Sequence, residues 1–153
     1  MYQRILVPLD GSQVAETVLP QAQMLAECAG AEIILLSVLV HPGYDYFIPE
    51  PALATAAYQN QLNEMKAYLE RTAARLGEHG LHVQTEICEG SVAEAILDYA
   101  DSKQADLIAM STHGRSGLGR FLMGSVAEKI IRSAKVPVLM VRPVHESAPA
   151  VKH

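Results

Sequence analysis

The sequence lacks a long apolar segment and has few cysteines. Half of its 153 residues are apolar, but no apolar run approaches the roughly 20 residues that a membrane-spanning helix needs. The two cysteines, Cys28 and Cys88, match no metal-binding or redox spacing, so we interpret them as small core residues in a reducing cytoplasm. The start, MYQRILVPLD, is too strand-like for a signal peptide. We therefore expect a soluble cytoplasmic protein without a membrane partner.

Acidic residues are missing from one window, although the protein as a whole is acidic. The formal net charge is −5, which argues against nucleic acid as a partner because phosphate backbones favour basic surfaces. Between Asp106 and Glu128 there is no acidic residue, while the same window carries His113, Arg115 and Arg120. An acid-free basic window in an acidic chain indicates a loop that binds an anion.

No pairing of a nucleophile with a base is visible either. The six histidines show no metal-ligand spacing, and His79 and His82 flank a Gly-Leu turn where we expect them to face water. Without a candidate nucleophile or base, the sequence does not predict efficient catalysis, and no metal is expected to be held directly by side chains.

Short apolar runs alternate with longer amphipathic segments along the chain. The runs cover 4–9, 32–40, 82–88, 105–111 and 136–142. Most are nearly continuous in apolar residues, as in strands buried on both faces, whereas the third alternates and predicts an edge strand. This order predicts an α/β protein with a parallel sheet and helices on both faces. We expect one domain over 1–142 and a flexible tail over 143–153.

The dipeptide Gly-Ser occurs three times, at 11–12, 90–91 and 124–125, each time ahead of a helical stripe. In the second and third copies a Glu follows the Ser by three residues, which predicts a capping box at a helix start. In the first copy the Glu is one residue later, so Ser12 can cap but the box does not close. The repeat by itself predicts helices and no ligand.

The third copy differs because a glycine- and arginine-rich loop, STHGRSGLGRFLMGS, precedes it. Glycines let the backbone approach a ligand closely, and the amides at the next helix start favour an anion. No Lys follows Gly124, so this is not a P-loop, and the glycine spacing also departs from G-x-G-x-x-G. The alternative interpretation is a flexible surface loop.

Two further segments leave alternatives open. Asp10 ends the first apolar run, where its carboxylate could accept hydrogen bonds from ribose hydroxyls, help to hold a cation or simply form a turn. The segment 41–50 carries Tyr44, Tyr46 and Phe47. It could cover a pocket, pack on a partner subunit or be an anchored loop.

Four segments resemble the universal stress protein family, over about residues 2–142: RILVPLDGS, IILLSV, STHGRSGLGRFLMGSVAEKI and VPVLMVR. The signature of the family's ATP-binding subgroup is G-x-x-G, nine residues, then G-[ST]. Gly114, the nine residues 115–123, Gly124 and Ser125 match it, whereas Ser111 stands at the position of the first glycine.

The resemblance implies a Rossmann-like, open five-stranded parallel sheet in the order 3-2-1-4-5. It also implies that ATP, ADP or AMP binds at the strand ends with Mg²⁺ or Mn²⁺ on the phosphates. With the loop residues, the predicted binding set is Pro8, Leu9, Asp10, Val38, Met110, Ser111, His113, Gly114, Arg115, Gly117, Gly124, Ser125 and Val126. A homodimer through strand 136–142 is implied as well.

The leading hypothesis is an adenine-nucleotide-binding stress or signalling protein with little or no turnover. One alternative is a member of the same family that binds no nucleotide and acts through protein contacts. Another is an enzyme on adenine nucleotides, such as a slow ATP hydrolase.

Overall fold

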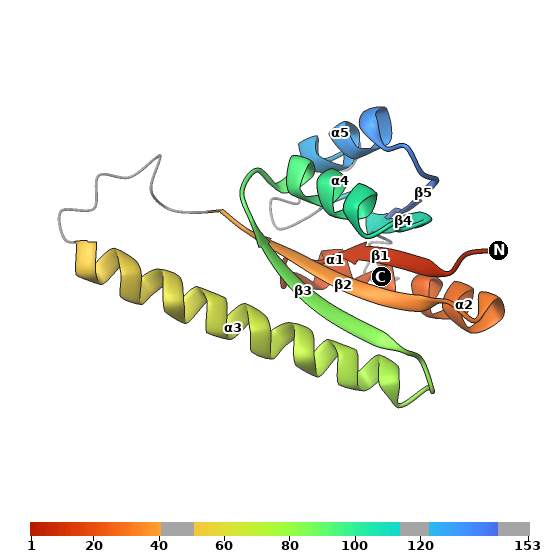
Figure 1. The fold of residues 1–153 in the computed structure, drawn as a ribbon, viewed down its shortest axis with the longest axis horizontal. Coiled ribbons are helices and arrows are strands. Elements are labelled where there is room, and N and C mark those ends of the chain that lie inside the picture. The colour runs from red at the N-terminus through yellow and green to blue at the C-terminus, as the bar shows by residue number, and fades with distance from the viewer. Residues whose placement is uncertain (41–50, 114–122, 144–153) are drawn as a thin grey trace, which may run out of the picture.

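A five-stranded parallel sheet organises the computed structural model, which describes residues 1–40, 51–113 and 123–143. The strands are β1 (Arg4–Pro8), β2 (Glu32–Leu39), β3 (Val83–Glu89), β4 (Leu107–Ser111) and β5 (Val138–Val141). Their order is β3-β2-β1-β4-β5, and all four neighbouring pairs are parallel (Figure 1). The predicted sheet order is confirmed, and so is the edge position of the run at 82–88.

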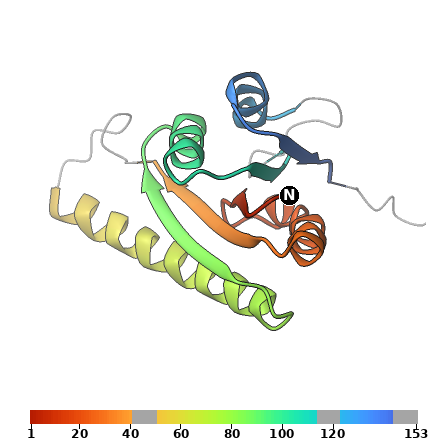
Figure 2. The same ribbon diagram turned by 45° about the vertical axis from the view of Figure 1, so that its right-hand side comes forward.

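Helices cover both faces of this sheet. They are α1 (Gln13–Glu16), α2 (Leu19–Ala29), α3 (Pro51–Gly77), α4 (Val92–Ser102) and α5 (Ser125–Ser133). The first three pack on one face, and α4 and α5 pack together on the other (Figure 2). The first predicted helical stripe is divided into α1 and α2, and Pro20, which has no N–H to donate, lies in the first turn of α2.

The core residues of the central strands point alternately to the two layers. In β1, Ile5 and Val7 pack beneath α2, and Leu6 packs beneath α4 and α5; all three are 0% exposed. Each such side chain contributes about 1.5–3 kcal/mol through burial. Because β1, β2 and β4 have neighbours on both sides and both faces, their sequences are continuously apolar.

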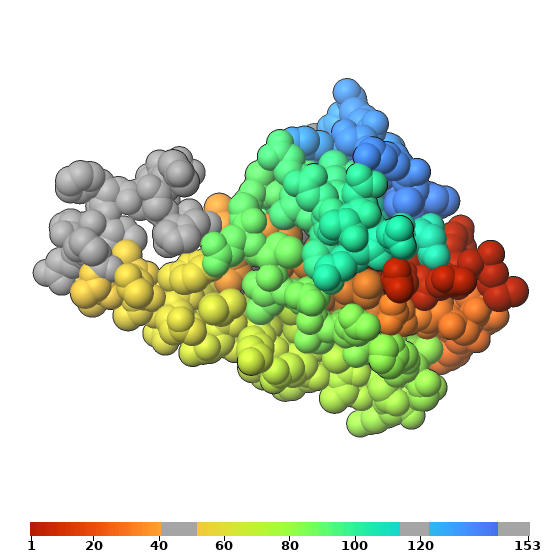
Figure 3. Space-filling view, viewed as in Figure 1, coloured from red at the N-terminus to blue at the C-terminus, as the bar shows by residue number. Residues whose placement is uncertain are grey.

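The helix α3 is longer than the sheet that it covers. Its second half buries Leu69, Thr72 and Leu76, whereas its first turns extend past the end of the sheet (Figures 1 and 3). It ends at Gly77, as the glycines at 77 and 80 predict. No helix in the described part of the chain is long and apolar enough to cross a membrane.

The interpretation of both cysteines as core residues is wrong for one of them. Cys28 is exposed on α2, because the buried stripe of that helix runs through Leu19, Ala22 and Ala26 instead. Cys88 on β3 is half-buried, and this burial raises the pKa of its thiol. The predictions on the loop 41–50 and the tail beyond 143 lie outside the described residues.

Candidate functional site

The candidate site lies at the carboxyl ends of β1, the central strand, and its neighbour β4. After β1 the chain turns to α1 on one face, and α5, which follows β4, lies on the other. Such a divergence creates a crevice outside the strand ends, which is where open α/β sheets bind ligands. A cavity of about 300 Å³ occupies this position.

The cavity gathers residues that are far apart in the sequence. It is lined by Pro8, Leu9, Asp10, Ala15, Leu36, Val38, Val92, Ile96, Met110, Ser111, Thr112, His113, Gly124, Ser125, Val126 and Ala127. Ten of the thirteen predicted binding residues are among them. The other three, Gly114, Arg115 and Gly117, lie outside the described residues. The binding role of the whole set stays a prediction.

One wall of the cavity is apolar, and sequence reasoning missed most of it. Leu36 and Val38 come from β2, Val92 and Ile96 from α4, and Met110 from β4. Val92 and Ile96 belong to the helical stripe that follows the second Gly-Ser, for which the sequence predicted a helix and no ligand. Their sequence carries no signal that the start of α4 borders a cavity, because that depends on how far β2 extends past β1.

Asp10 is held in place by the residue that starts α1. The backbone N–H of Ser12 donates to Asp10 Oδ1 at 2.9 Å, and the Ser12 hydroxyl donates to the same oxygen at 2.5 Å. Ser12 Oγ also accepts from the N–H of Ala15 at 3.1 Å, so the predicted helix cap is confirmed. These bonds fix a half-buried carboxylate at the rim of the cavity.

Gly124 brings the end of the glycine-rich loop against its beginning. Its N–H donates to the Thr112 carbonyl at 2.9 Å, and a Cβ on Gly124 would lie only 3.3 Å from that oxygen. Thr112 in turn donates its N–H to the Val141 carbonyl of β5 at 2.9 Å. The backbone φ of Gly124 is −60°, so close approach, rather than a left-handed conformation, is the reason for glycine here.

The two predicted capping boxes do not form. Ser125 is the first residue of α5 and Gly124 is its N-cap, with no side chain capping the helix. Ser91 does stand at the N-cap of α4, but its oxygen accepts from no first-turn amide. The first amides of α5 therefore keep their capacity for an anion, in a helix start whose Ser125 and Val126 line the cavity.

Ser111, the departure from the family signature, is buried in the cavity wall. It is 4% exposed, and its Oγ accepts from the N–H of His113 at a long 3.4 Å. The His113 ring lies beside Thr112, with Nδ1 2.9 Å from Thr112 Oγ1. The extra hydroxyl at position 111 thus contacts the beginning of the loop.

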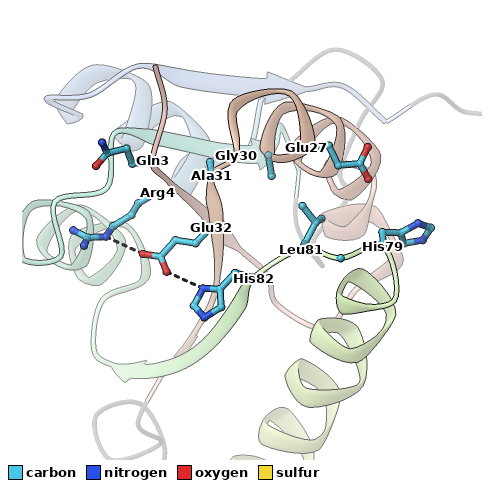
Figure 4. A pocket seen from close by; sticks show the side chains of 11 residues that line it. Gln3, Arg4, Glu27, Gly30, Ala31, Glu32, His79, Leu81 and His82 are labelled. Carbon is cyan, nitrogen blue, oxygen red and sulfur yellow. Dashed lines mark hydrogen bonds and ion pairs between the residues drawn. The ribbon is translucent and has the colours of Figure 1, made fainter.

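A second, larger hollow of about 640 Å³ lies at the opposite, amino-terminal edge of the sheet. There Glu32 lies between Arg4, at 2.8 Å, and His82, at 3.1 Å (Figure 4). Both α2 and α3 end beside this hollow, and helix C-termini disfavour anions. Its size therefore does not make it the better site for a phosphate ligand.

Metal-binding side chains do not cluster in the described residues. Across 1–40, 51–113 and 123–143, no group of three or more His, Cys, Asp or Glu is placed to hold an ion.

Comparison with known proteins identifies the family. The model of the universal stress protein family matches residues 1–142. Universal stress protein MJ0531 of Methanocaldococcus jannaschii is 36% identical over 93% of this chain and 83% of its own length. The solved structure of MJ0577 has a TM-score of 0.85 at 29% identity, covering 95% of this chain and 99% of that one.

A universal stress protein solved in complex with cAMP is also similar, with a TM-score of 0.66 at 25% identity over 92% of this chain and 97% of its own. The matched range includes all five strands and the cavity between β1 and β4. The chain belongs to the universal stress protein family.

Proposed function

We propose that the protein binds an adenine nucleotide at the carboxyl edge of its sheet and acts in the stress response or in signalling, in the cytoplasm. The observation that carries this proposal is the cavity between β1 and β4. It combines an apolar wall for a flat base, a fixed carboxylate at Asp10 for ribose hydroxyls and an uncapped helix start for phosphate.

The size and the composition of the cavity fit this ligand class. Its volume of about 300 Å³ is at the lower end of the ~300–1,000 Å³ found for small-molecule sites. Val38, Met110 and Ile96 would contact the base, and Gly124 and Ser125 the phosphates. A Mg²⁺ or Mn²⁺ ion would sit on the phosphates, since no described cluster of side chains is placed to hold one. The similar protein that binds cAMP supports the class of ligand.

Catalytic turnover is at most slow in this proposal. Asp10 and His113 are the titratable groups among the described lining residues. Asp10 accepts hydrogen bonds from Ser12. The hydroxyl that the His113 ring contacts, Thr112 Oγ1 at 2.9 Å from Nδ1, belongs to the preceding residue in the chain. Binding that is not followed by chemistry suits a protein that senses the nucleotide.

Calorimetry on protein stripped of bound nucleotide tests the proposal. We expect saturable binding of ATP or AMP in the presence of Mg²⁺, with no comparable heat from uridine nucleotides. If millimolar ATP with Mg²⁺ gives no binding, the proposal is wrong, and the family member that acts through protein contacts alone becomes the better reading.

We also propose that two copies pair through β5. This strand is at the edge of the sheet, and its four side chains are only half-buried. The carbonyls of Pro137 and Val141 face β4, so the N–H groups of Val138 and Met140 point outward, where a second strand can accept hydrogen bonds from them.

The substitution Met140→Pro tests this pairing, because it removes one outward N–H and leaves the pairing with β4 intact. Sedimentation should then show a dimer for the wild type and a monomer for the variant.

A further inference from the structure

Ser37 is the buried polar residue of β2, whose other polar residue, Glu32, is only partly buried. Ser37 is 1% exposed in the run EIILLSVL of β2. Its Oγ donates to the carbonyl of Leu9 at 2.7 Å. Leu9 lines the cavity, and so does Val38, the residue after Ser37.

The hydrogen-bonding register shows what this contact replaces. Pairing of β1 with β2 ends at Pro8 opposite Leu36, and the N–H of Leu9 still donates to the Leu36 carbonyl at 2.8 Å. In a parallel ladder the next bond would run from the N–H of Val38 to the carbonyl of Leu9. That carbonyl accepts from the Ser37 hydroxyl instead.

Alternate residues of β2 direct their backbone N–H and C=O groups to opposite neighbouring strands, and this alternation determines where the Val38 backbone points. The N–H of Ile33 donates to the carbonyl of His82, and the Leu39 carbonyl accepts from Gly90, so odd positions face β3. Even positions face β1, and β1 pairing has ended before residue 38. The N–H and C=O of Val38 therefore face the crevice beside the apolar wall.

We propose that Ser37 is a positioning residue for base recognition: by taking the Leu9 carbonyl, its hydroxyl ends the β1–β2 ladder one bond early and keeps the Val38 backbone available to the edge of a purine. This inference rests on the proposed function. A donor and an acceptor on one residue can pair with the acceptor and donor that adjoin on an adenine edge. Without the hydroxyl, the Leu9 carbonyl can accept from the Val38 N–H, which extends the β1–β2 ladder by one hydrogen bond.

The experiment uses Ser37→Ala, with Ser37→Thr as the variant that keeps a hydroxyl. Thr72→Val is the matched control, because Thr72 is also buried (2% exposed) and its hydroxyl also donates to a backbone carbonyl, that of Tyr68, on α3. Calorimetry gives the Kd for ATP and for inorganic tripolyphosphate, which has no base. Long-range HNCO spectra report whether the Val38 N–H is bonded to the Leu9 carbonyl.

We expect Ser37→Ala to weaken ATP binding about three- to tenfold, the size of one lost neutral hydrogen bond, and to leave tripolyphosphate binding unchanged. The Val38–Leu9 coupling should be absent from the wild type and present in this variant. Ser37→Thr should restore ATP binding, and Thr72→Val should bind ATP like the wild type although it loses stability.

The inference is overturned if the coupling is already present in the wild type, or if a folded Ser37→Ala protein binds ATP unchanged. An equal loss of ATP and tripolyphosphate affinity would also overturn it, because the effect would then not be on the base. Should the wild type bind no nucleotide at all, the proposed function fails, and the coupling experiment still decides whether Ser37 sets the end of the ladder.

Discussion

The sheet has an amino edge and a carboxyl edge, formed by the two ends of the same strands, and these two edges differ in which polar groups they leave unpaired. At the amino edge, Arg4, His82 and Gln84 all engage Glu32, and two helices end nearby. At the carboxyl edge, a helix start without a side-chain cap and a fixed carboxylate border an apolar wall. The amino-edge hollow has about twice the volume. We therefore expect a ligand to bind at the carboxyl ends of the strands, where backbone groups at a helix start are left without a side-chain cap, rather than in the larger hollow.

The largest expected effect comes from glycines at the two edges. Gly124→Val forces side-chain atoms against the Thr112 carbonyl, already 3.3 Å from a bare Cβ, and should weaken ATP binding by about 100-fold or more. At the amino edge, Gly30 has a φ of +67° and nothing within 4 Å of an added Cβ. Gly30→Ala should therefore cost about 1 kcal/mol of stability and leave ATP binding unchanged. Calorimetry and thermal melts separate the two results, and a loss of binding in both variants would contradict the assignment.

Carboxylates at the two edges give the next effect. Asp10→Asn keeps the shape but removes the charge that accepts hydrogen bonds from ribose, and ATP affinity should fall by about tenfold. Glu32→Gln breaks the pairs with Arg4 and His82 and should leave the affinity as it is. Titration calorimetry on both variants checks this. Equal affinity for Asp10→Asn and the wild type would exclude Asp10 from the site.

The two cysteines differ in exposure, so their rates of alkylation can be compared. Cys28 is exposed on α2, whereas burial, and then the nearby Glu86, raise the pKa of the Cys88 thiol on β3. Because the thiolate is the reactive form, iodoacetamide near pH 8 should modify Cys28 at least about fivefold faster than Cys88. Peptide mass spectrometry over time reads both rates. Faster modification of Cys88 would mean that β3 is more open than the structure shows.

The smallest effect concerns the ion pair that joins α4 and α5 beside the cavity. Lys129 lies 2.7 Å from Glu94, and it lowers the pKa of that carboxyl. A carboxyl whose pKa is lower in the folded than in the unfolded state stabilises the protein at pH values above the unfolded-state pKa. This stabilisation is lost as the pH falls through the folded-state pKa. Lys129→Gln should therefore lower Tm slightly at pH 7 and not at all in acid below the folded-state pKa of Glu94. A difference that persists in acid would indicate lost packing rather than lost charge.

The sequence predicted the sheet because the strands follow simple patterning. Continuous apolar runs such as 105–111 correctly indicated strands buried on both faces, and the alternation in 82–88 correctly indicated an edge. The capping box at α5 failed because a Ser followed by a Glu indicates a helix start without setting its first residue. At α4, Ser91 stands at the N-cap as predicted, but its oxygen caps no first-turn amide. At α5 the helix begins at Ser125, since Gly124 is held against Thr112 by a contact between distant segments.

Residue chemistry alone pointed to the candidate site only at the chain's turns, and the family resemblance added strand residues such as Val38 and Met110. Asp10 follows the first apolar run, and Gly124 lies near the end of the glycine-rich loop, so both positions have a local signature in the sequence. Leu36 and Ile96 look like any core residue in the sequence, and the role of Ser37 depends on where the β1 ladder ends. Register and the relative length of neighbouring strands are tertiary properties, so no local sequence pattern predicts them.

Chemical-shift mapping of ATP with Mg²⁺ onto the amide spectrum of the wild type tests the central claim most directly. We predict that the largest shifts fall on Val38, Gly124 and their neighbours at the carboxyl edge, and that Glu32 and His82 at the amino edge stay unshifted. Shifts centred on Glu32 and His82, with Val38 and Gly124 unchanged, would contradict the account.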